Sequence, residues 1–274
     1  MSEYVQLIGE YPNIDFAGNR TGSDKSLFLL EAPNIHPQNY HTETIKKYKK
    51  VYTWNSKLYS EYRLLGMDVV QLPNFPLFDN YSILDKFTPF EDKVNGVCLM
   101  CRHREKPSCE FDISYNREQV MFGLSIQSVY PLELHCYGRI PYCGIQYKGV
   151  IGDGLGMYPS SLDKLKMLDK YRFNLCFENA YHELWSWDYI TEKITDCFKA
   201  KCVPIYWGCY NIQERIPKEL YVDYREFKDV HKLAEHLNSI SKEQYIDMTE
   251  KAFEWEKETK LGNIEELRSI LDND

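Results

Sequence analysis

Short apolar runs alternate along the chain with amphipathic segments of helix length. This alternation is typical of βα units, which build parallel sheets covered by helices. In the first part of the chain, strands are expected at 4–8, 27–31, 50–54 and 68–72, and helices at 42–49 and 57–65. Proline, asparagine and aspartate residues interrupt the pattern at 72–89, which we interpret as a linker between two lobes.

The alternation becomes more regular in the second part of the chain. The expected order is strand 94–101, helix 117–130, strand 132–137, helix 160–170, strand 173–178, helix 190–201 and strand 203–207. Two closing helices are expected at 227–240 and 242–258, and the second could pack back across the first lobe. The pattern predicts an α/β fold whose second part is a doubly wound nucleotide-binding lobe.

Composition and charge narrow the class of protein. Hydrophobic residues make up 43% of the chain and charged residues 27%, which is typical of a globular protein and not of a disordered one. The net charge of −8 argues against nucleic acid as a partner, because phosphate backbones are held by clustered Lys and Arg. No apolar run approaches the roughly 18 residues that span a bilayer, and the first residues do not resemble a signal peptide. We therefore expect a cytoplasmic protein without a membrane span.

The nine cysteines are expected to stay reduced and to serve mainly as small core residues. One arrangement resembles a metal site, because Cys98, Cys101 and His103 are close in sequence. On a strand, however, residues three apart point to opposite faces, so we expect no metal there. The glycine-rich stretch 152–156 is expected to be a surface loop and not a phosphate-binding loop, because no helix follows it directly.

Two polar residues lie at the carboxyl end of the expected strand that finishes at Glu178. Ligands of open α/β sheets bind beyond such strand ends, which places Glu178 and Asn179 at the edge of a site. Asp188 is expected to cap the next helix, with Glu192 and Lys193 in its first turn, where free N–H groups and the helix dipole attract anions. This charged pair suits a nucleotide diphosphate, although spacing alone favours an ordinary solvated helix start.

Four motifs, in a fixed order, carry a resemblance to a known family: YRFNLCFEN at 171–179, DYITEK at 188–193, CVPIYWG at 202–208 and YVDYREF at 221–227. Together they closely resemble the donor-binding signature of the α1,3/α1,4-fucosyltransferase family, glycosyltransferase family 10. Weaker similarities lie upstream, in LEAPN at 30–34, in LHCYGR at 134–139 and in Arg117, which opens an expected helix. The stretch that carries the four motifs covers about a fifth of the chain.

The resemblance implies a GT-B-like α/β fold, with two facing Rossmann-like lobes, parallel sheets and the donor site in the C-terminal lobe. Residues 1–90 would form the N-terminal acceptor-side lobe, residues 91–240 the GDP-fucose-binding lobe and residues 241–274 closing helices. The implied enzyme is an inverting fucosyltransferase that moves L-fucose from GDP-fucose to a hydroxyl of an acceptor glycan, in an α1,3-type linkage. No cofactor or divalent metal would be required, since the only Asp-x-Asp motif lies at the terminal residues 272–274.

Carried over position by position, the resemblance implies roles for six residues. Glu31 would be the base that takes the proton of the acceptor hydroxyl, and Arg117 and Lys193 would stabilise the departing diphosphate. Three further residues would contact the donor. Glu192 would bind the ribose hydroxyls, and Asn179 and Tyr189 would contact the ribose, the phosphate or the fucose. The structural alternatives are an exposed strand-end glutamate for Glu31 and an ordinary helix-start arginine for Arg117.

The sequence departs from the family pattern in two places. The loop 180–187 is longer than expected, and we interpret its Trp185 and Trp187 either as an acceptor-stacking surface or as a covering lid. The first lobe is short, so acceptor recognition could be simplified. We interpret Glu178 as a strand cap in preference to a donor ligand.

Three other functions fit parts of the sequence. A transferase of the same fold could use another GDP- or UDP-sugar, and a non-catalytic module could bind a sugar nucleotide or glycan without turnover. A helix-rich assembly protein could use its acidic C-terminal helices as an adhesive surface. No motif indicates the acceptor, the linkage position or the oligomeric state.

Overall fold

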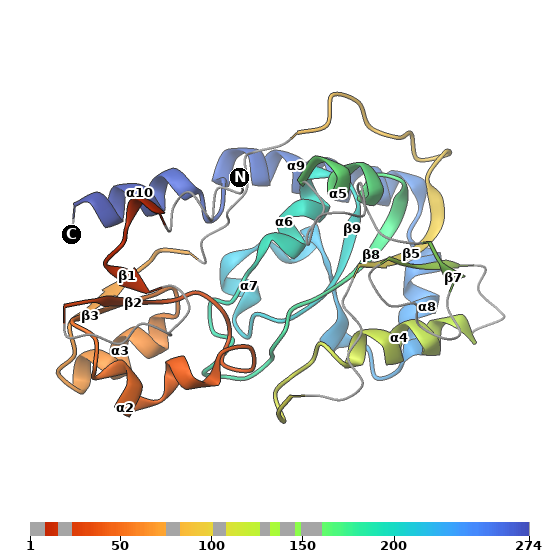
Figure 1. Ribbon diagram of the computed structural model, residues 1–274. Coiled ribbons are helices and arrows are strands. Elements are labelled where there is room, and N and C mark those ends of the chain that lie inside the picture. The colour runs from red at the N-terminus through yellow and green to blue at the C-terminus, as the bar shows by residue number, and fades with distance from the viewer. Residues whose placement is uncertain are drawn as a thin grey trace.

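A computed structural model describes residues 9–15, 24–74, 83–100, 108–126, 132–137, 146–148 and 161–273 of the protein. These residues form two α/β lobes that lie side by side (Figure 1). The strand predicted at 4–8 and the glycine-rich stretch 152–156 lie outside the described residues, as do Cys101 and His103.

Within the described residues, the larger sheet has six parallel strands: β5 (Val94–Met100), β6 (Glu133–Tyr137), β7 (Gln146–Tyr147), β8 (Tyr171–Phe177), β9 (Val203–Trp207) and β10 (Val222–Asp223). Their spatial order is β10-β9-β8-β5-β6-β7. Counted along the chain and read from β7, this is the 3-2-1-4-5-6 order of the doubly wound fold. The order reverses between β5 and β8, and folds of this type bind ligands at the carboxyl ends of the strands that flank such a reversal.

Alternating side chains of β5 and β8 build a core on each face of this sheet. Val97, Leu99 and Phe173 pack on one face, whereas Cys98 and Cys176 pack on the other. The first face is covered by α4 (Asn116–Ser125) and α8 (Val230–Ser239), the second by α5 (Ser161–Leu168), α6 (Glu192–Lys199) and α9 (Lys242–Thr259) (Figure 1). Because both faces are buried, these strands appear in the sequence as nearly continuous apolar runs.

The smaller sheet has, among the described residues, four parallel strands in the order β1 (Ile14–Asp15), β2 (Ser26–Leu29), β3 (Lys50–Thr53) and β4 (Val69–Gln71). Leu27 and Val51 share a core with α3 (Ser56–Leu64) on one face. Phe28 and Tyr52 share a core with α10 (Ile264–Asp272) on the other face. The period-two alternation of buried side chains therefore holds in both lobes.

The helix predicted at 42–49 is shorter in the structure. It consists of α2 (Thr42–Ile45), preceded by the 3₁₀ turn η1 (Pro37–Tyr40). The backbone N–H of Lys49 donates to the carbonyl of Lys25 at 2.7 Å, so the chain has turned toward β2 before a longer helix could form. The remaining short elements are α7 (Ile212–Arg215), η2 (Lys218–Leu220) and η3 (Tyr224–Glu226).

The closing helices also differ from the prediction. The second predicted closing helix is α9, which packs on α6 with Ala252 in the core of the larger lobe, so the expectation that it crosses the first lobe is wrong. Left-handed backbone at Lys260 (φ 45°) and Gly262 (φ 72°) separates α9 from α10, and α10 is the helix that lies over the smaller lobe (Figure 1). Leu267 and Leu271 of α10 pack against the smaller sheet.

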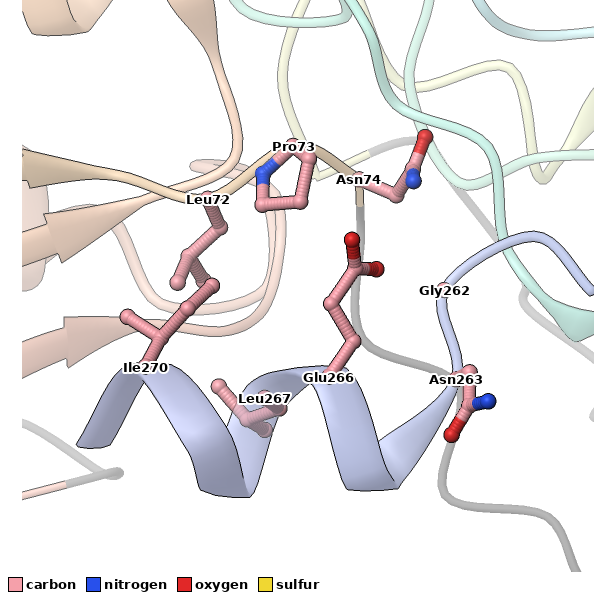
Figure 2. Close-up of a pocket in the computed structure, with 8 residues that line it drawn as sticks. All are labelled: Leu72, Pro73, Asn74, Gly262, Asn263, Glu266, Leu267 and Ile270. Atoms are coloured by element: carbon pink, nitrogen blue, oxygen red, sulfur yellow. The ribbon is translucent and has the colours of Figure 1, made fainter. Parts of the chain in front are cut away.

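A small pocket lies where α10 meets the end of the smaller sheet (Figure 2). Leu72 points toward Leu267 and Ile270, while Asn74 and Glu266 supply polar groups. None of the residues predicted to hold the donor or to act as base lines this pocket. We interpret it as incomplete packing between α10 and the smaller lobe.

The loop after β8 joins the two lobes. From the smaller lobe, Asn55 Nδ2 donates to the carbonyl of Leu184 at 2.7 Å, and Ser56 Oγ donates to Asp188 Oδ2 at 2.6 Å. Asp188 is buried and has left-handed backbone (φ 61°). Polar contacts of the loop therefore tie the start of α3 to the larger lobe.

Trp185 and Trp187 belong to the same junction. The Trp185 ring meets the Tyr40 ring edge-on at 5.9 Å. The Trp187 ring stacks on Tyr210 at 5.9 Å, and the Lys57 Nζ lies 3.8 Å from the Trp187 ring centroid. Both tryptophans therefore contribute to packing between the lobes, a role that neither interpretation from the sequence included.

Gly96 allows β5 to lie close to β6, and replacing it tests this packing. A Cβ at Gly96 would overlap the carbonyl oxygen of Glu133. We expect Gly96→Ala to lower the free energy of unfolding by ~1–3 kcal/mol, measured by urea denaturation, because the two backbones must separate. Gly9→Ala is the control, since no atom lies within 4 Å of a Cβ at Gly9. Equal stability of the two variants would contradict the close approach.

Asp188 is the polar centre of the lobe junction. Besides Ser56, it accepts a hydrogen bond from Asn211 Nδ2 at 3.1 Å. We expect Asp188→Ala to lower the free energy of unfolding by about 2 kcal/mol or more, because buried donors lose their acceptor. Asp188→Asn should lose less, since asparagine keeps one acceptor oxygen and tolerates left-handed backbone. Guanidinium denaturation of both variants measures the difference, and an unaffected alanine variant would show that the junction is weak.

Candidate functional site

The carboxyl end of β8 lies where the strand order reverses, and Arg117 of α4 braces it. The Arg117 guanidinium is buried and donates to the carbonyl of Phe177 from Nε at 3.1 Å and from Nη2 at 2.5 Å. Its Nη2 also donates to the carbonyl of Glu178 at 2.8 Å and to Asn179 Oδ1 at 3.1 Å. Two of the predicted donor residues, Arg117 and Asn179, are therefore in direct contact.

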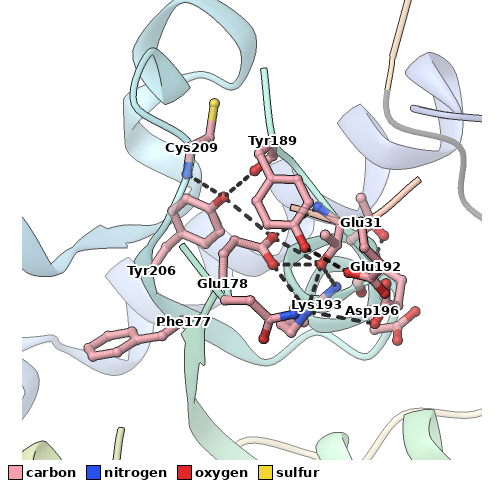
Figure 3. A network of polar contacts seen from close by, with 12 residues as sticks. Glu31, Phe177, Glu178, Tyr189, Glu192, Lys193, Asp196, Tyr206 and Cys209 are labelled. Carbon is pink, nitrogen blue, oxygen red and sulfur yellow. Dashed lines mark hydrogen bonds and ion pairs between the residues drawn. The ribbon is translucent and has the colours of Figure 1, made fainter. Parts of the chain in front are cut away.

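Glu178 is the first residue after β8, and it is completely buried. Its Oε1 accepts from the backbone N–H of Thr191 at 2.9 Å. Its Oε2 accepts from the Thr191 hydroxyl at 2.8 Å and from the Lys193 Nζ at 3.1 Å (Figure 3). Glu178 is thus more than the strand cap that the sequence indicated, because it joins β8 to the first turn of α6.

The start of α6 corrects one prediction and bears out another. The N-cap is Thr191 and not Asp188, and α6 begins at Glu192. An N-cap residue takes extended backbone, as Thr191 does (φ −105°, ψ 179°), whereas Asp188 is left-handed (φ 61°). A threonine directly before the first helical residue is a known N-cap signal that was available in the sequence. Glu192 and Lys193 lie in the first turn, as predicted.

Lys193 remains a cation in these surroundings. Burial lowers the pKa of its ammonium group, but the carboxylates of Glu178 and Glu192 raise the pKa by more, so that the net shift is upward. The positive charge of Arg117 opposes this shift, as expected for two cations at the same site. The Lys193 side chain is 26% exposed, which leaves it accessible to an anionic ligand.

Glu192 keeps its negative charge beside two lysines. Burial raises the pKa of its carboxyl, but Lys193 and Lys164 outweigh burial and lower the pKa to about 2. Lys164, on α5, lies 3.9 Å from Glu192 Oε1 and forms a 2.5 Å ion pair with Asp196 of α6. No signal in the sequence indicates Lys164 as a site residue, because its position depends on the packing of α5 against α6.

Glu31 follows β2 and approaches the same network from the smaller lobe. Its carboxylate accepts from the Tyr189 hydroxyl at 3.3 Å, and the Tyr40 hydroxyl donates to its backbone carbonyl. Burial raises the pKa of the Glu31 carboxyl above 4.5, although the nearby Lys193 acts in the opposite direction. A carboxylate with a raised pKa is a stronger base than an exposed one.

Tyr189 lies between the two lobes. It is completely buried, and its ring lies 5.0 Å from the ring of Trp54. Nearby, Asn34 Nδ2 donates to the carbonyl of Asn179 at 2.8 Å, which ties the segment after β2 to the segment after β8. The structure therefore brings the six predicted site residues into one region, since Arg117 contacts Asn179 and also influences Lys193. Figure 3 shows four of the six, with Tyr189 in contact with Glu31.

The described part of the chain contains no group of three or more His, Cys, Asp or Glu side chains arranged to hold a metal ion. No helix among the described residues is both long and apolar enough to cross a bilayer. Cys98, one member of the suspected metal motif, is packed in the core beneath α6. A metal-independent reaction and a cytoplasmic location stay predictions.

Solved structures with a similar fold are glycosyltransferases. A crystal structure of an α1,3-fucosyltransferase with GDP gives a TM-score of 0.55 at 15% identity, and the match covers 86% of this chain and 68% of that one. A glycosyltransferase from Rickettsia africae ESF-5 gives a TM-score of 0.55 at 13% identity, covering 98% and 78%. The predicted GT-B-like α/β fold, with two facing Rossmann-like lobes, is confirmed, while the position of the donor site stays a prediction.

Known proteins of related sequence are fucosyltransferases. Alpha-(1,3)-fucosyltransferase FucT of Helicobacter pylori is 32% identical over 88 residues, which are 31% of this chain and 18% of that protein. Human 4-galactosyl-N-acetylglucosaminide 3-alpha-L-fucosyltransferase 9 is 24% identical over 157 residues, which are 57% of this chain and 38% of that protein. The matched part of the chain thus spans less than two-fifths of the length of these relatives.

The sequence model of the C-terminal part of glycosyltransferase family 10 (fucosyltransferase) matches residues 128–271. This match covers more than half of the chain and includes β8, α6 and β9, with Glu178 directly after β8 and both Glu192 and Lys193 in α6. The chain therefore belongs to glycosyltransferase family 10, the fucosyltransferase family.

Proposed function

We propose that this protein transfers L-fucose from GDP-fucose to a hydroxyl of an acceptor glycan, with inversion at the anomeric carbon and formation of an α1,3-type linkage. The observation that carries the proposal is the meeting of three groups at the end of β8. Lys193 and Arg117 supply positive charge from the larger lobe, and Glu31 supplies a basic carboxylate from the smaller lobe.

The larger lobe suits a nucleotide diphosphate. The diphosphate would lie against Lys193, close to Arg117 and the N-terminal turn of α6, where the helix dipole adds to the positive charge. The ionised Glu192, whose side chain is 45% exposed, would accept hydrogen bonds from ribose hydroxyls. A fold neighbour that is an α1,3-fucosyltransferase with GDP supports a guanine nucleotide in this proposal.

The reaction follows from the charges at the site. Glu31 would remove the proton of the acceptor hydroxyl as the acceptor oxygen bonds to the anomeric carbon of fucose. The bond from that carbon to the diphosphate oxygen breaks at the same time, and GDP leaves with the bonding electrons. Lys193 and Arg117 would stabilise the negative charge that grows on the leaving diphosphate, which is the task that a divalent metal performs in other transferases.

The acceptor class is proposed from a relative. The human relative is named for 4-galactosyl-N-acetylglucosaminide as its acceptor, which makes N-acetyllactosamine the first acceptor to assay. The relevant surface of this chain would come from the smaller lobe beside Glu31, because that lobe supplies the proposed base.

We expect the purified protein to transfer fucose from GDP-fucose to at least one member of an array of N-acetyllactosamine, related oligosaccharides and monosaccharides. Mass spectrometry of the products measures the transfer. The rate should be unchanged by EDTA, because both cations that face the diphosphate belong to the chain. Stabilisation against heat by GDP-fucose, with none by UDP-sugars, is the binding readout; a ligand at 100 times its Kd adds about 2.7 kcal/mol.

Two outcomes of this assay would overturn the proposal. Stabilisation and transfer with a UDP-sugar alone would identify another transferase of the same fold. GDP-fucose binding without either transfer or slow hydrolysis would indicate a non-catalytic module.

Replacing Glu31 tests the base. We expect Glu31→Gln to lower kcat by about 10²–10⁴-fold with little change in GDP affinity, because only the proton acceptor is removed. Since burial raises the pKa of Glu31, the wild-type kcat/KM should fall as the pH drops through this raised pKa, at a higher pH than for an ordinary glutamate, because the carboxyl then takes up a proton. Radiometric transfer assays across pH measure both effects.

The control for this variant is Glu43→Gln, a change of an exposed glutamate in α2 of the same lobe. Its activity should equal that of the wild type. If Glu31→Gln also retained full activity, another group would have to be the base.

A further inference from the structure

Glu178 is a buried carboxylate, and other groups of the protein must replace the water that would otherwise solvate its charge. An ionised carboxylate without water is unfavourable unless cations and hydrogen-bond donors replace that water. The nearest compensating groups come from two residues at the start of α6, Thr191 and Lys193, and a longer contact comes from the Tyr206 hydroxyl of β9. Glu178 is completely buried, so in this structure it is not positioned to contact a ligand itself.

The contacts of Lys193 limit the directions in which its ammonium group can point. Of its three N–H groups, one donates to Glu178 Oε2 at 3.1 Å and one to Thr191 Oγ1 at 3.0 Å. The carboxylate of Glu192 lies 4.0 Å away, beyond hydrogen-bond distance. Within the described part of the structure, two N–H groups are therefore used to hold the side chain, and the third is left for a ligand.

The Glu178 side chain occupies space that is free only because residue 208 is a glycine. A Cβ at Gly208, directly after β9, would overlap the Cγ of Glu178 and lie 2.6 Å from its Cβ and 2.9 Å from the Tyr206 hydroxyl. That hydroxyl lies 3.5 Å from Glu178 Oε1 and accepts from the backbone N–H of Cys209 at 3.0 Å. The carboxylate is therefore enclosed by β9 on one side and by the start of α6 on the other.

We propose that Glu178 is a positioning residue for the transfer reaction, whose carboxylate, together with Thr191, fixes the ammonium of Lys193 in the orientation that binds the diphosphate of the donor. The inference rests on the proposed function, since it assigns how the phosphate-binding lysine is held. In this proposal Glu178 contacts neither the donor nor the acceptor and acts only through Lys193.

Several charged groups face Lys193, and they determine how its protonation depends on Glu178. They are Glu178 after β8, Glu192 on α6, Arg117 on α4 and Glu31 from the smaller lobe. Burial lowers the pKa of Lys193 most strongly, and Glu178 is the largest of the opposing influences. Removal of the Glu178 charge should therefore let Lys193 lose its proton at a lower pH than in the wild type.

Glu178→Gln tests the proposal, because glutamine has nearly the same shape and can still accept from the Thr191 N–H. We expect kcat to fall by about 10²-fold, the order of loss that follows misplacement of a reacting group, without a comparable rise in KM for GDP-fucose. The alkaline limb of the pH–rate profile should move to lower pH. Glu178→Asp keeps the charge, so it should retain the wild-type alkaline limb even if its shorter side chain lowers kcat.

Two further variants separate positioning from stability. Glu256→Gln alters another buried glutamate of the same lobe, which pairs with Lys199 at 4.0 Å outside the site. It should lower the melting temperature while leaving the alkaline limb unchanged. Gly208→Ala should displace the intact Glu178 carboxylate and reproduce the low kcat and the shifted limb of Glu178→Gln.

The outcomes distinguish this inference from the proposed function. A wild-type protein that transfers no fucose would overturn the proposed function itself. An active wild type, with Glu178→Gln showing unchanged kcat and an unchanged pH profile, would overturn the positioning role alone. If Glu178→Gln fails to fold, the Glu178→Asp variant decides: a wild-type alkaline limb supports the role, and a limb shifted to lower pH overturns it.

Discussion

The site depends most on the buried ion pair between Glu178 and Lys193. The pair joins the residue directly after β8 to the first turn of α6. It therefore sets how close the end of the strand lies to the start of the helix. Arg117 braces the same strand end through backbone carbonyls, from the opposite face of the sheet. Two cations from two helices are thereby held where the strand order of the doubly wound sheet reverses.

One connection of the chain shapes both sides of the site. The segment between β8 and α6 supplies Asp188, which binds the smaller lobe, and Tyr189, which contacts Glu31. The same segment ends at Thr191, which caps α6 and bonds Glu178. The distance between the proposed base and the phosphate-binding lysine is therefore controlled by this segment, and α10 packs against the smaller sheet in the same core as Tyr189.

Local signals in the sequence predicted correctly those features that depend on a single helix or strand. The order of strands and helices in the larger lobe, and the location of Glu192 and Lys193 in a first turn, follow from apolar periodicity and helix capping. The prediction of Asp188 as N-cap was wrong because its carboxylate is recruited by Ser56 of the other lobe. Lys164 was missed because nothing near it in sequence indicates that α5 will place it beside Asp196.

The sequence alone determined the α/β class, the family resemblance and the location of Glu192 and Lys193 in the first turn of a helix, because these depend on residue types and on spacings within single elements. Tertiary structure decided that Glu178 is buried against Lys193, that Trp185 and Trp187 join the lobes, and that α10 rather than α9 crosses to the smaller sheet. These contacts join segments that are distant in the chain or lie on different elements. Their energies depend on burial and on partners that only the packed fold supplies.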